Sequence, residues 1–353
     1  MSSLNPQGAN RARLESALAG RLAPVAVYAV YDWFAQNRPK VDWQRLFALG
    51  LGQINHATMV RHTRPHVQVI ETTGLHESGQ MRRDVRWVTD IGELHEWHLG
   101  EWQQEYLIKS PEDYRILARA LSDVTVTPTL EAFAASEAQI GDNGVTLGCT
   151  LLRRTPFQAI QIDFAGLERF SMDIGEGRPE LLYLIEVMND LTCREFEALA
   201  QTPARFIKLW ENLTIETMGP RLYRERLVPV YEKLFGILRR SGQRLCVHYD
   251  GKLRSIAQDI QRLPFDMDSL TPPPEGDLSV AEARALWPEK FLWLHPPLGW
   301  HALPDALLAE RIRQMTKDAS PGGFCLMISE EVPSSWARTV PLILKTLGSM
   351  KKE

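Results

Sequence analysis

Short apolar runs alternate with long amphipathic segments over most of this chain, and this alternation limits the fold more than any other feature. From Ser110 onward each run has the length of a buried strand and is followed by a segment whose apolar residues recur with helical spacing. The runs are residues 145–150, 206–210, 244–249, 265–270, 291–295 and 324–329. Strands that alternate with helices are typical of a parallel sheet with crossover helices.

The number of these units favours a closed barrel. The apolar run Pro24 to Val30 adds a seventh strand, whereas the eighth strand is ambiguous in the sequence. An open doubly wound sheet fits the same alternation, but no glycine-rich phosphate turn follows the first strand. We therefore predict an α/β fold, a TIM-like (β/α)8 barrel with an N-terminal β-rich extension.

The N-terminal third has a different pattern. Residues 9–20 have the spacing of a short helix, and residues 53–106 alternate polar and apolar side chains, as in HVQVIETT and RRDVRWVTDIGELHEW. Alternation of this kind indicates antiparallel strands with one face in water. We expect residues 1–109 to form a helix, the first strand and a β-rich lobe packed on the barrel. Residues 110–353 would form the main part of the barrel, in one structural domain overall.

Composition limits the class of function. The 353 residues carry a net charge of −4 without a basic run, which gives no reason to expect nucleic-acid binding. The sequence contains neither a signal peptide nor an apolar stretch of membrane-spanning length, and its four cysteines are widely spaced. We therefore expect a cytoplasmic protein without a membrane anchor. Nucleotide-binding glycine loops and the G-x-S-x-G motif of hydrolases are absent as well.

Polar residues at the ends of the predicted strands are the candidates for chemistry, because the active site of a (β/α)8 barrel lies there. His248 and Asp250 follow one strand and, being two residues apart, point to the same side. Glu211 and Glu330 end two other strands. A histidine with two or three carboxylates suits Zn²⁺, Fe²⁺ or Mn²⁺. Candidate catalytic residues at strand ends are Glu211, Tyr249 and His295.

Several stretches resemble the uroporphyrinogen decarboxylase superfamily. They are GPRLYRERLVPVYEKLFGILRRSGQRLCVHYDGKLRSIAQDI, the units that follow it, and SPGGFCLMISEEVP near the end. The resemblance covers residues from about 10 to 350 and implies a TIM-like barrel. The superfamily holds decarboxylases and zinc-dependent, corrinoid-linked methyltransferases. The arginine-rich N-terminal motif of the decarboxylases is replaced here by PVAVYAVYDWFAQNRPK.

The resemblance also implies a metal-ligand set. In the methyltransferases the zinc ligands resemble His-x-Cys after one strand and a Cys after the last. The corresponding residues here are His248, Asp250 and Glu330, so both thiolates are changed to carboxylates. Such a set leaves a harder, more electrophilic metal, which suits polarising an oxygen or nitrogen.

The resulting hypothesis is a metal-dependent demethylating methyltransferase. The substrate would be a small O- or N-methyl compound, the metal zinc or another divalent ion, and the acceptor a corrinoid on a separate protein. The alternative is a decarboxylase of a porphyrinogen-like polycarboxylate, for which Arg153, Arg154 and Arg254 would converge on the barrel mouth. A non-catalytic binding protein is a third reading, and a homodimer is compatible with each of the three.

Overall fold

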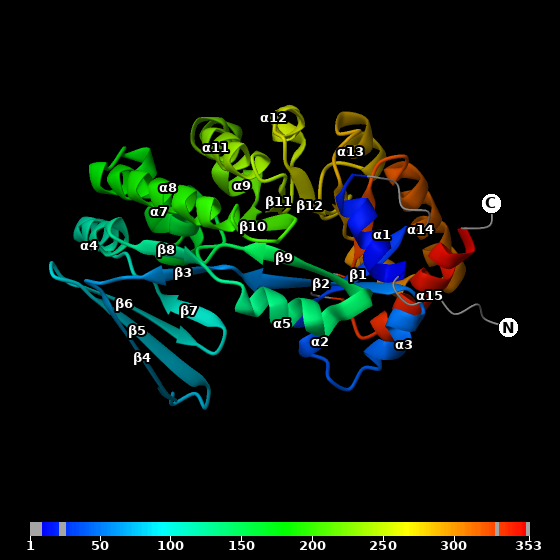
Figure 1. Cartoon of the computed structure of the whole chain (residues 1–353), viewed down its shortest axis with the longest axis horizontal. Helices are drawn as coiled ribbons and strands as arrows, with labels where there is room; N and C mark the ends of the chain where they lie inside the picture. Colours follow the sequence, from blue (N-terminus) through cyan, green and yellow to red (C-terminus); the bar gives the residue numbers. More distant parts are fainter. Residues whose placement is uncertain (1–8, 21–25, 329–331, 351–353) are drawn as a thin grey trace. The chain divides into compact units, whose positions relative to one another are not determined.

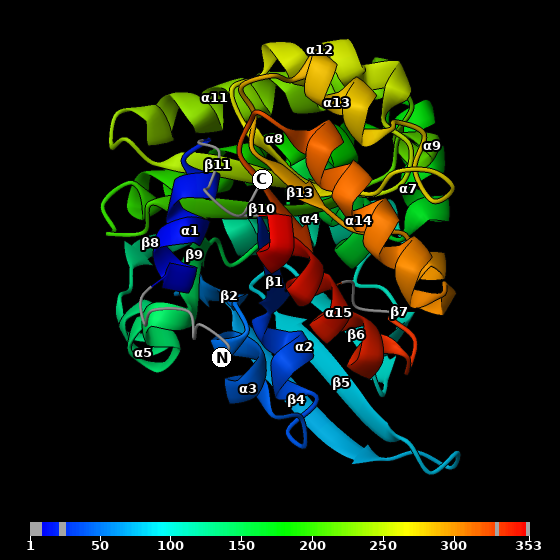
Figure 2. The same cartoon turned by 90° about the vertical axis from the view of Figure 1, so that its right-hand side faces the viewer.

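Eight parallel strands close into a barrel in the computed structural model, which describes residues 9–20, 26–328 and 332–350. Figures 1 and 2 show these strands and the helices that connect them. In order around the barrel the strands are β1 (Val27–Tyr31), β2 (Leu51–Thr58), β9 (Gly144–Cys149), β10 (Phe206–Leu213), β11 (Arg244–Tyr249), β12 (Asp266–Leu270), β13 (Leu292–Leu294) and β14 (Phe324–Met327). The predicted TIM-like barrel is confirmed, and each of the seven predicted runs overlaps one strand.

The eighth strand is β2, in a segment that the sequence pattern placed elsewhere. Residues from 53 onward were expected to be antiparallel, and for residues 53–58 that prediction is wrong, because β2 pairs in parallel with β1 and β9. The polar Gln53 and Asn55 mimic the alternation of a strand with one wet face. Asn55 is buried instead and donates a hydrogen bond to Oγ of Ser136 at 2.9 Å. A polar side chain can be buried in a strand if it is hydrogen-bonded, and the polar–apolar alternation therefore did not indicate an exposed face here.

The chain forms two compact units. The barrel unit consists of residues 1–59, 130–149 and 203–353, and the second unit of residues 60–129 and 150–202. These ranges do not coincide with a boundary between residues 109 and 110. The chain enters the second unit after β2 and again after β9 (Figure 1).

Alternate residues of the barrel strands point inward. Val27, Phe206 and Phe291 from the beginnings of three strands share one buried cluster with Leu14 and Ala17. Leu14 and Ala17 belong to helix α1 (Ala9–Leu18), which therefore packs apolar side chains against the N-terminal end of the barrel. Apolar side chains therefore fill the interior of the barrel next to this helix.

Helices connect the strands of the barrel unit, as expected for crossover connections. They are α2 (Asp32–Gln36), α3 (Trp43–Ala48), α5 (Glu131–Ile140), α9 (Ile215–Met218), α10 (Pro220–Leu222), α11 (Val228–Arg239), α12 (Ala257–Arg262), α13 (Val280–Leu286), α14 (Asp305–Ala319) and α15 (Trp336–Ser349). Among the described residues, no helix is both long and apolar enough to span a membrane.

The second unit contains the antiparallel strands that the alternating pattern predicts. Four of them form one sheet: β4 (Gln68–Leu75), β5 (Met81–Val88), β6 (Glu93–Leu99) and β7 (Trp102–Glu105). Strand β3 (Val60–Thr63) pairs with β8 (Thr125–Pro128). The helices are α4 (Pro111–Ser122), α6 (Pro156–Ala159), α7 (Leu167–Gly175) and α8 (Pro179–Leu199). Helix α4 begins with Pro111 in its first turn, and Asp113 accepts a hydrogen bond from the Ser110 N–H at 2.7 Å.

Candidate active site

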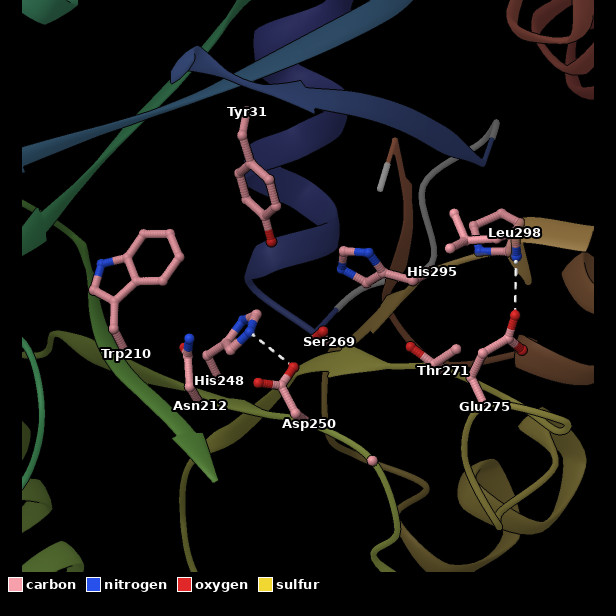
Figure 3. Close-up of a pocket in the computed structure, with 12 residues that line it drawn as sticks. Tyr31, Trp210, Asn212, His248, Asp250, Ser269, Thr271, Glu275, His295 and Leu298 are labelled. Carbon is pink, nitrogen blue, oxygen red and sulfur yellow. Dashed lines mark hydrogen bonds and ion pairs between the residues drawn. The ribbon is translucent and has the colours of Figure 1, made fainter. Parts of the chain in front are cut away.

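A cavity of about 390 Å³ opens at the C-terminal ends of β10, β11, β12 and β13. Its volume is that of a small-molecule site, and its position is where (β/α)8 barrels carry their active sites. Figure 3 shows the side chains around it. The lining residues are Tyr31, Trp210, Asn212, His248, Asp250, Gly251, Ser269, Thr271, Glu275, His295, Pro296 and Leu298. All of them belong to the barrel unit.

His248 stands between two carboxylates. Its Nε2 lies 3.3 Å from Oδ1 of Asp250, as Figure 3 shows, and its Nδ1 lies 3.5 Å from Oδ1 of Asp268. Burial disfavours the charged imidazolium, but the Asp268 charge and the hydrogen bond with Asp250 outweigh burial and raise the pKa of His248. The two carboxylates therefore favour the protonated form of the ring.

Beneath His248 lies a buried ion pair that sequence reasoning missed. Nζ of Lys208 lies 2.6 Å from Oδ2 of Asp268, and both side chains are fully buried. The Tyr31 hydroxyl donates to Oδ1 of Asp268 at 3.0 Å. Burial would raise the pKa of Asp268, but Lys208 and His248 together hold it far below its usual range. The signal in the sequence was the presence of charged residues inside two apolar runs, one lysine in FIKLW and two aspartates in FDMDSL.

Aromatic rings surround the ammonium group of Lys208. Its Nζ lies 3.5 Å from the ring centroid of Trp210 and 4.4 Å from that of Tyr31. A cation over an aromatic face is attracted by the ring quadrupole. The Lys208 charge is therefore stabilised from two sides, by a carboxylate and by aromatic faces.

Two further histidines in the barrel are held neutral. Burial lowers the pKa of His295, at the end of β13, to about 4, and its Nε2 has no hydrogen-bond partner among the described residues. Burial also lowers the pKa of His56, on β2, to about 4, and its Nδ1 lies 3.2 Å from Oδ1 of Asp32. The sequence assigned His56 to the polar lobe because β2 was not recognised as a barrel strand. His295, a predicted catalytic residue, does line the cavity.

Irregular strand ends turn two polar side chains into the cavity wall. The register of β10 shifts between Leu209 and Leu213, and that of β12 shifts between Met267 and Leu270. Asn212 and Ser269, within these irregular segments, have positive φ values of 47° and 68°. Backbone conformations of this kind cost energy for residues other than glycine and are concentrated at functional sites. In a regular strand Ser269 would follow the inward Asp268 and point outward.

Glu211 and Tyr249, the other predicted catalytic residues, do not line the cavity. Both are fully buried on the outer side of the barrel, since their neighbours Trp210 and His248 point inward. The hydroxyls of Tyr223 and Tyr249 lie 2.9 Å apart. Burial and the charge of Glu211 raise the pKa of Tyr231 in the same cluster. The structure thus brings His248, Asp250 and His295 together but not Glu211 and Tyr249.

Of the three predicted metal ligands the structure describes His248 and Asp250, whereas Glu330 lies outside the described residues. Across residues 9–20, 26–328 and 332–350, no group of three His, Cys, Asp or Glu side chains is arranged to hold a metal ion. Asp268, the carboxylate nearest to His248 besides Asp250, is already paired with the Lys208 ammonium. A cation bound next to this ammonium would be repelled by it. The described residues therefore do not by themselves fit a zinc centre.

The arginines that a polycarboxylate substrate requires are engaged elsewhere. Arg154, in the second unit, lies 2.9 Å from Asp163, and Arg254, in the barrel unit, lies 3.0 Å from Glu282. Arg153 belongs to the second unit. The described residues that line the cavity include two carboxylates and no arginine. This lining does not favour a porphyrinogen-like polycarboxylate.

Comparisons with known proteins give low similarity. No family model and no curated protein matches the chain. A methyltransferase from Methanosarcina mazei is similar in structure, with 16% identity, a TM-score of 0.48 and 63% of each chain covered, less than two thirds of its length. A B12-independent methionine synthase from Shewanella sp. W3-18-1 gives 9% identity and a TM-score of 0.46 over 88% of this chain and 85% of that one. A xylose isomerase domain protein from Planctomyces limnophilus gives 12% identity and a TM-score of 0.36, over 92% of this chain and 98% of that one.

Proposed function

We propose that this protein is an enzyme that transfers a methyl group from a small O- or N-methyl compound, with His248 as proton donor to the departing atom. The observation that carries the proposal is the position of His248 at the cavity wall, with a carboxylate beside each ring nitrogen. Two flanking carboxylates favour the imidazolium, which is the form that can donate a proton. The choice of methyl transfer comes from the resemblance of the CVHYDGKL and SPGGFCLMISEEVP stretches to the methyltransferases.

The proposed step balances in charge and electrons. The bond between the methyl carbon and the departing oxygen or nitrogen breaks, and its electron pair stays on the departing atom. For an oxygen, or for the nitrogen of an uncharged amine, the proton on Nε2 of His248 then neutralises the departing group. A quaternary ammonium donor departs as a neutral amine and needs no proton. The methyl carbon bonds to an electron pair of the acceptor, for which the resemblance implies a reduced corrinoid on a separate small protein.

Neighbouring residues support this role of His248. Asp268 faces Nδ1 of His248 and can fix the orientation of the ring. Lys208 keeps Asp268 ionised through the ion pair of 2.6 Å. His295, neutral and with its Nε2 unpartnered in the described structure, can hydrogen-bond to the substrate. None of these residues needs a bound metal for its part.

A transfer assay tests the proposal. The purified protein is mixed with free cob(I)alamin and a panel of O- and N-methyl compounds, and formation of methylcobalamin is followed by absorbance. We expect transfer from at least one donor and a loss of about 100- to 10,000-fold in the variant His248→Asn. The matched control is His66→Asn, since the His66 side chain is 58% exposed and lies in the second unit. Transfer at the wild-type rate in His248→Asn would contradict the proposal.

Elemental analysis separates this proposal from the zinc site that the sequence predicts. A histidine that binds a metal through Nε2 cannot donate a proton from the same nitrogen. Stoichiometric zinc in the wild-type protein that is lost in both His248→Asn and Glu330→Ala would support the zinc site. The same result would contradict the role of His248 as proton donor.

A further inference from the structure

The cavity wall has a selective chemical composition. Its polar groups include two carboxylates, Asp250 and Glu275, and the hydroxyls of Ser269 and Thr271. The other polar side chains of the wall are Tyr31, Asn212, His248 and His295. One oxygen of Glu275 accepts a hydrogen bond from the Leu298 N–H at 3.2 Å, as Figure 3 shows. Carboxylate oxygens each accept more than one hydrogen bond, so Asp250 and Glu275 retain capacity to accept from a ligand.

Anionic ligands do not suit this wall. The residues that line the cavity include no arginine and no lysine among those described. The ammonium of Lys208 lies below, fully buried and 2.6 Å from Asp268. The imidazolium that His248 can form is already flanked by Asp250 at 3.3 Å and Asp268 at 3.5 Å. A ligand carboxylate would therefore find no unpaired cation and would be repelled by Asp250 and Glu275.

Cationic ligands lack a suitable aromatic face. Tyr31 and Trp210 are the rings on the wall, and both already face the ammonium of Lys208, at 4.4 Å and 3.5 Å from their centroids. A second cation at these rings would approach the first. The two carboxylates of the wall already have partners. Asp250 lies 3.3 Å from the His248 ring, and Glu275 accepts a hydrogen bond from the Leu298 N–H.

Neutral ligands with several hydroxyl groups suit the wall best. A ligand hydroxyl can donate to Asp250 or Glu275 and accept from Ser269 or Thr271, because a hydroxyl has one donor and two acceptor sites. The irregular end of β12 places the Ser269 side chain on the wall at a positive φ of 68°. Such strain persists where the surrounding structure enforces it, which fits a side chain that is needed at this place.

From this composition we propose that the substrate is a neutral methyl ether that carries at least two further free hydroxyl groups. The proposal rests on the proposed function in taking this cavity as the substrate site, and it narrows the O- or N-methyl compounds to polyhydroxylated ethers. Asp250 and Glu275 accept hydrogen bonds from the hydroxyls of the ligand. Ser269 and Thr271 donate to its oxygens, and the ether oxygen lies on the side of His248.

Binding of small matched ethers tests the proposal without any turnover. The probes are glycerol monomethyl ether, methoxyacetate and methoxyethylamine, each titrated into the wild-type protein by saturation-transfer NMR. We expect glycerol monomethyl ether to bind at least about tenfold more tightly than either charged ether, because unpaired polar groups are costly in a polar site. Equal or tighter binding of a charged ether would overturn the proposal, and so would the absence of measurable binding for all three.

Variants locate the binding on the cavity wall. Ser269→Ala and Glu275→Gln are each expected to weaken binding of glycerol monomethyl ether several-fold, about the value of one hydrogen bond. Ser255→Ala is the matched control, since Ser255 is exposed and does not line the cavity. Unchanged binding in both Ser269→Ala and Glu275→Gln would overturn the proposal.

The two proposals can fail separately. Binding of glycerol monomethyl ether without methyl transfer to cob(I)alamin would support the hydroxylated ligand and contradict the methyl transfer. Methyl transfer from a charged donor that binds more tightly would support the function and overturn the ligand class.

Discussion

The two faces of strands β10 and β11 carry two buried polar clusters of different kinds. The inner cluster contains Lys208, His248 and, from β12, Asp268, and it borders the cavity. The outer cluster contains Glu211 and Tyr249 with tyrosines of the following helical segment, and it does not border the cavity. Successive residues of one strand thus belong to opposite faces, since side chains alternate along a strand.

The difference between the two clusters shows that residue type alone does not determine whether a buried polar side chain has a role in catalysis. Glu211 and Tyr249 are as buried as Lys208 and Asp268, and all four could serve acid–base chemistry. Only the inner cluster reaches the cavity, through His248. We therefore assign chemistry to the inner cluster and packing to the outer one, and the following variants test this division.

The largest expected effect comes from the inner ion pair. Lys208→Met leaves the fully buried carboxylate of Asp268 without its cation, which typically costs about 3–5 kcal/mol of unfolding free energy. Urea unfolding measures the change. The double variant Lys208→Met with Asp268→Leu should recover most of the loss, because both buried charges are then removed. The control Lys252→Met removes an exposed ion pair with Glu216 and should leave the free energy of unfolding nearly unchanged.

The second effect concerns the orientation of His248. Asp268→Asn keeps the shape of the side chain but removes the charge that faces Nδ1 of His248. We expect methyl transfer to fall about 10- to 100-fold, as for other residues that orient a reacting group. Rates are compared at a temperature at which circular dichroism shows the variant folded. A wild-type rate would show that Asp268 contributes only to stability, and would contradict the assignment of chemistry to the whole inner cluster.

A smaller effect is expected on the outer face. Tyr249→Phe removes one of the two hydroxyls that lie 2.9 Å apart and should lower the free energy of unfolding by about 0.5–1.5 kcal/mol. The transfer rate should not change, since the ring does not line the cavity. A loss of activity similar to that of His248→Asn would break the division into two faces.

The smallest effect on catalysis is expected for Glu211→Gln. The carboxylate is buried with the tyrosines outside the barrel, so the transfer rate should stay within about threefold, less than 1 kcal/mol in the barrier. Steady-state kinetics with the best donor of the panel provide the measurement. A larger decrease would restore Glu211 as a catalytic residue, as the sequence predicted.

Much of the fold could be predicted because burial leaves a local pattern. The runs VTLGCT, RLCVHY and FCLMIS each became a barrel strand, and the helix after Ser110 begins where its capping residues stand. Strand β2 was not predicted as a barrel strand, because Gln53 and Asn55 are polar. The burial of Asn55 depends on a hydrogen bond to Ser136, which lies on another element. No local pattern records such a partner.

The site could be predicted only in part, for a related reason. The strand-end positions of His248, Asp250 and His295 follow from the alternation of strand and helix, and the structure places all three at one cavity. Ser269 could not be predicted, since an irregularity in β12 turns its side chain inward. The pairing of Lys208 with Asp268 could not be predicted either, because the two residues lie in different apolar runs and meet only in the folded barrel.

By itself the sequence determined a barrel of alternating strands and helices, with His248 and Asp250 at a strand end, because hydrophobic periodicity is a property of neighbouring residues. Only the tertiary structure decided that Lys208 pairs with Asp268 under His248, and that Glu211 and Tyr249 face away from the cavity. Barrel closure fixes the register between strands that are distant in the chain, and register determines which side chains meet.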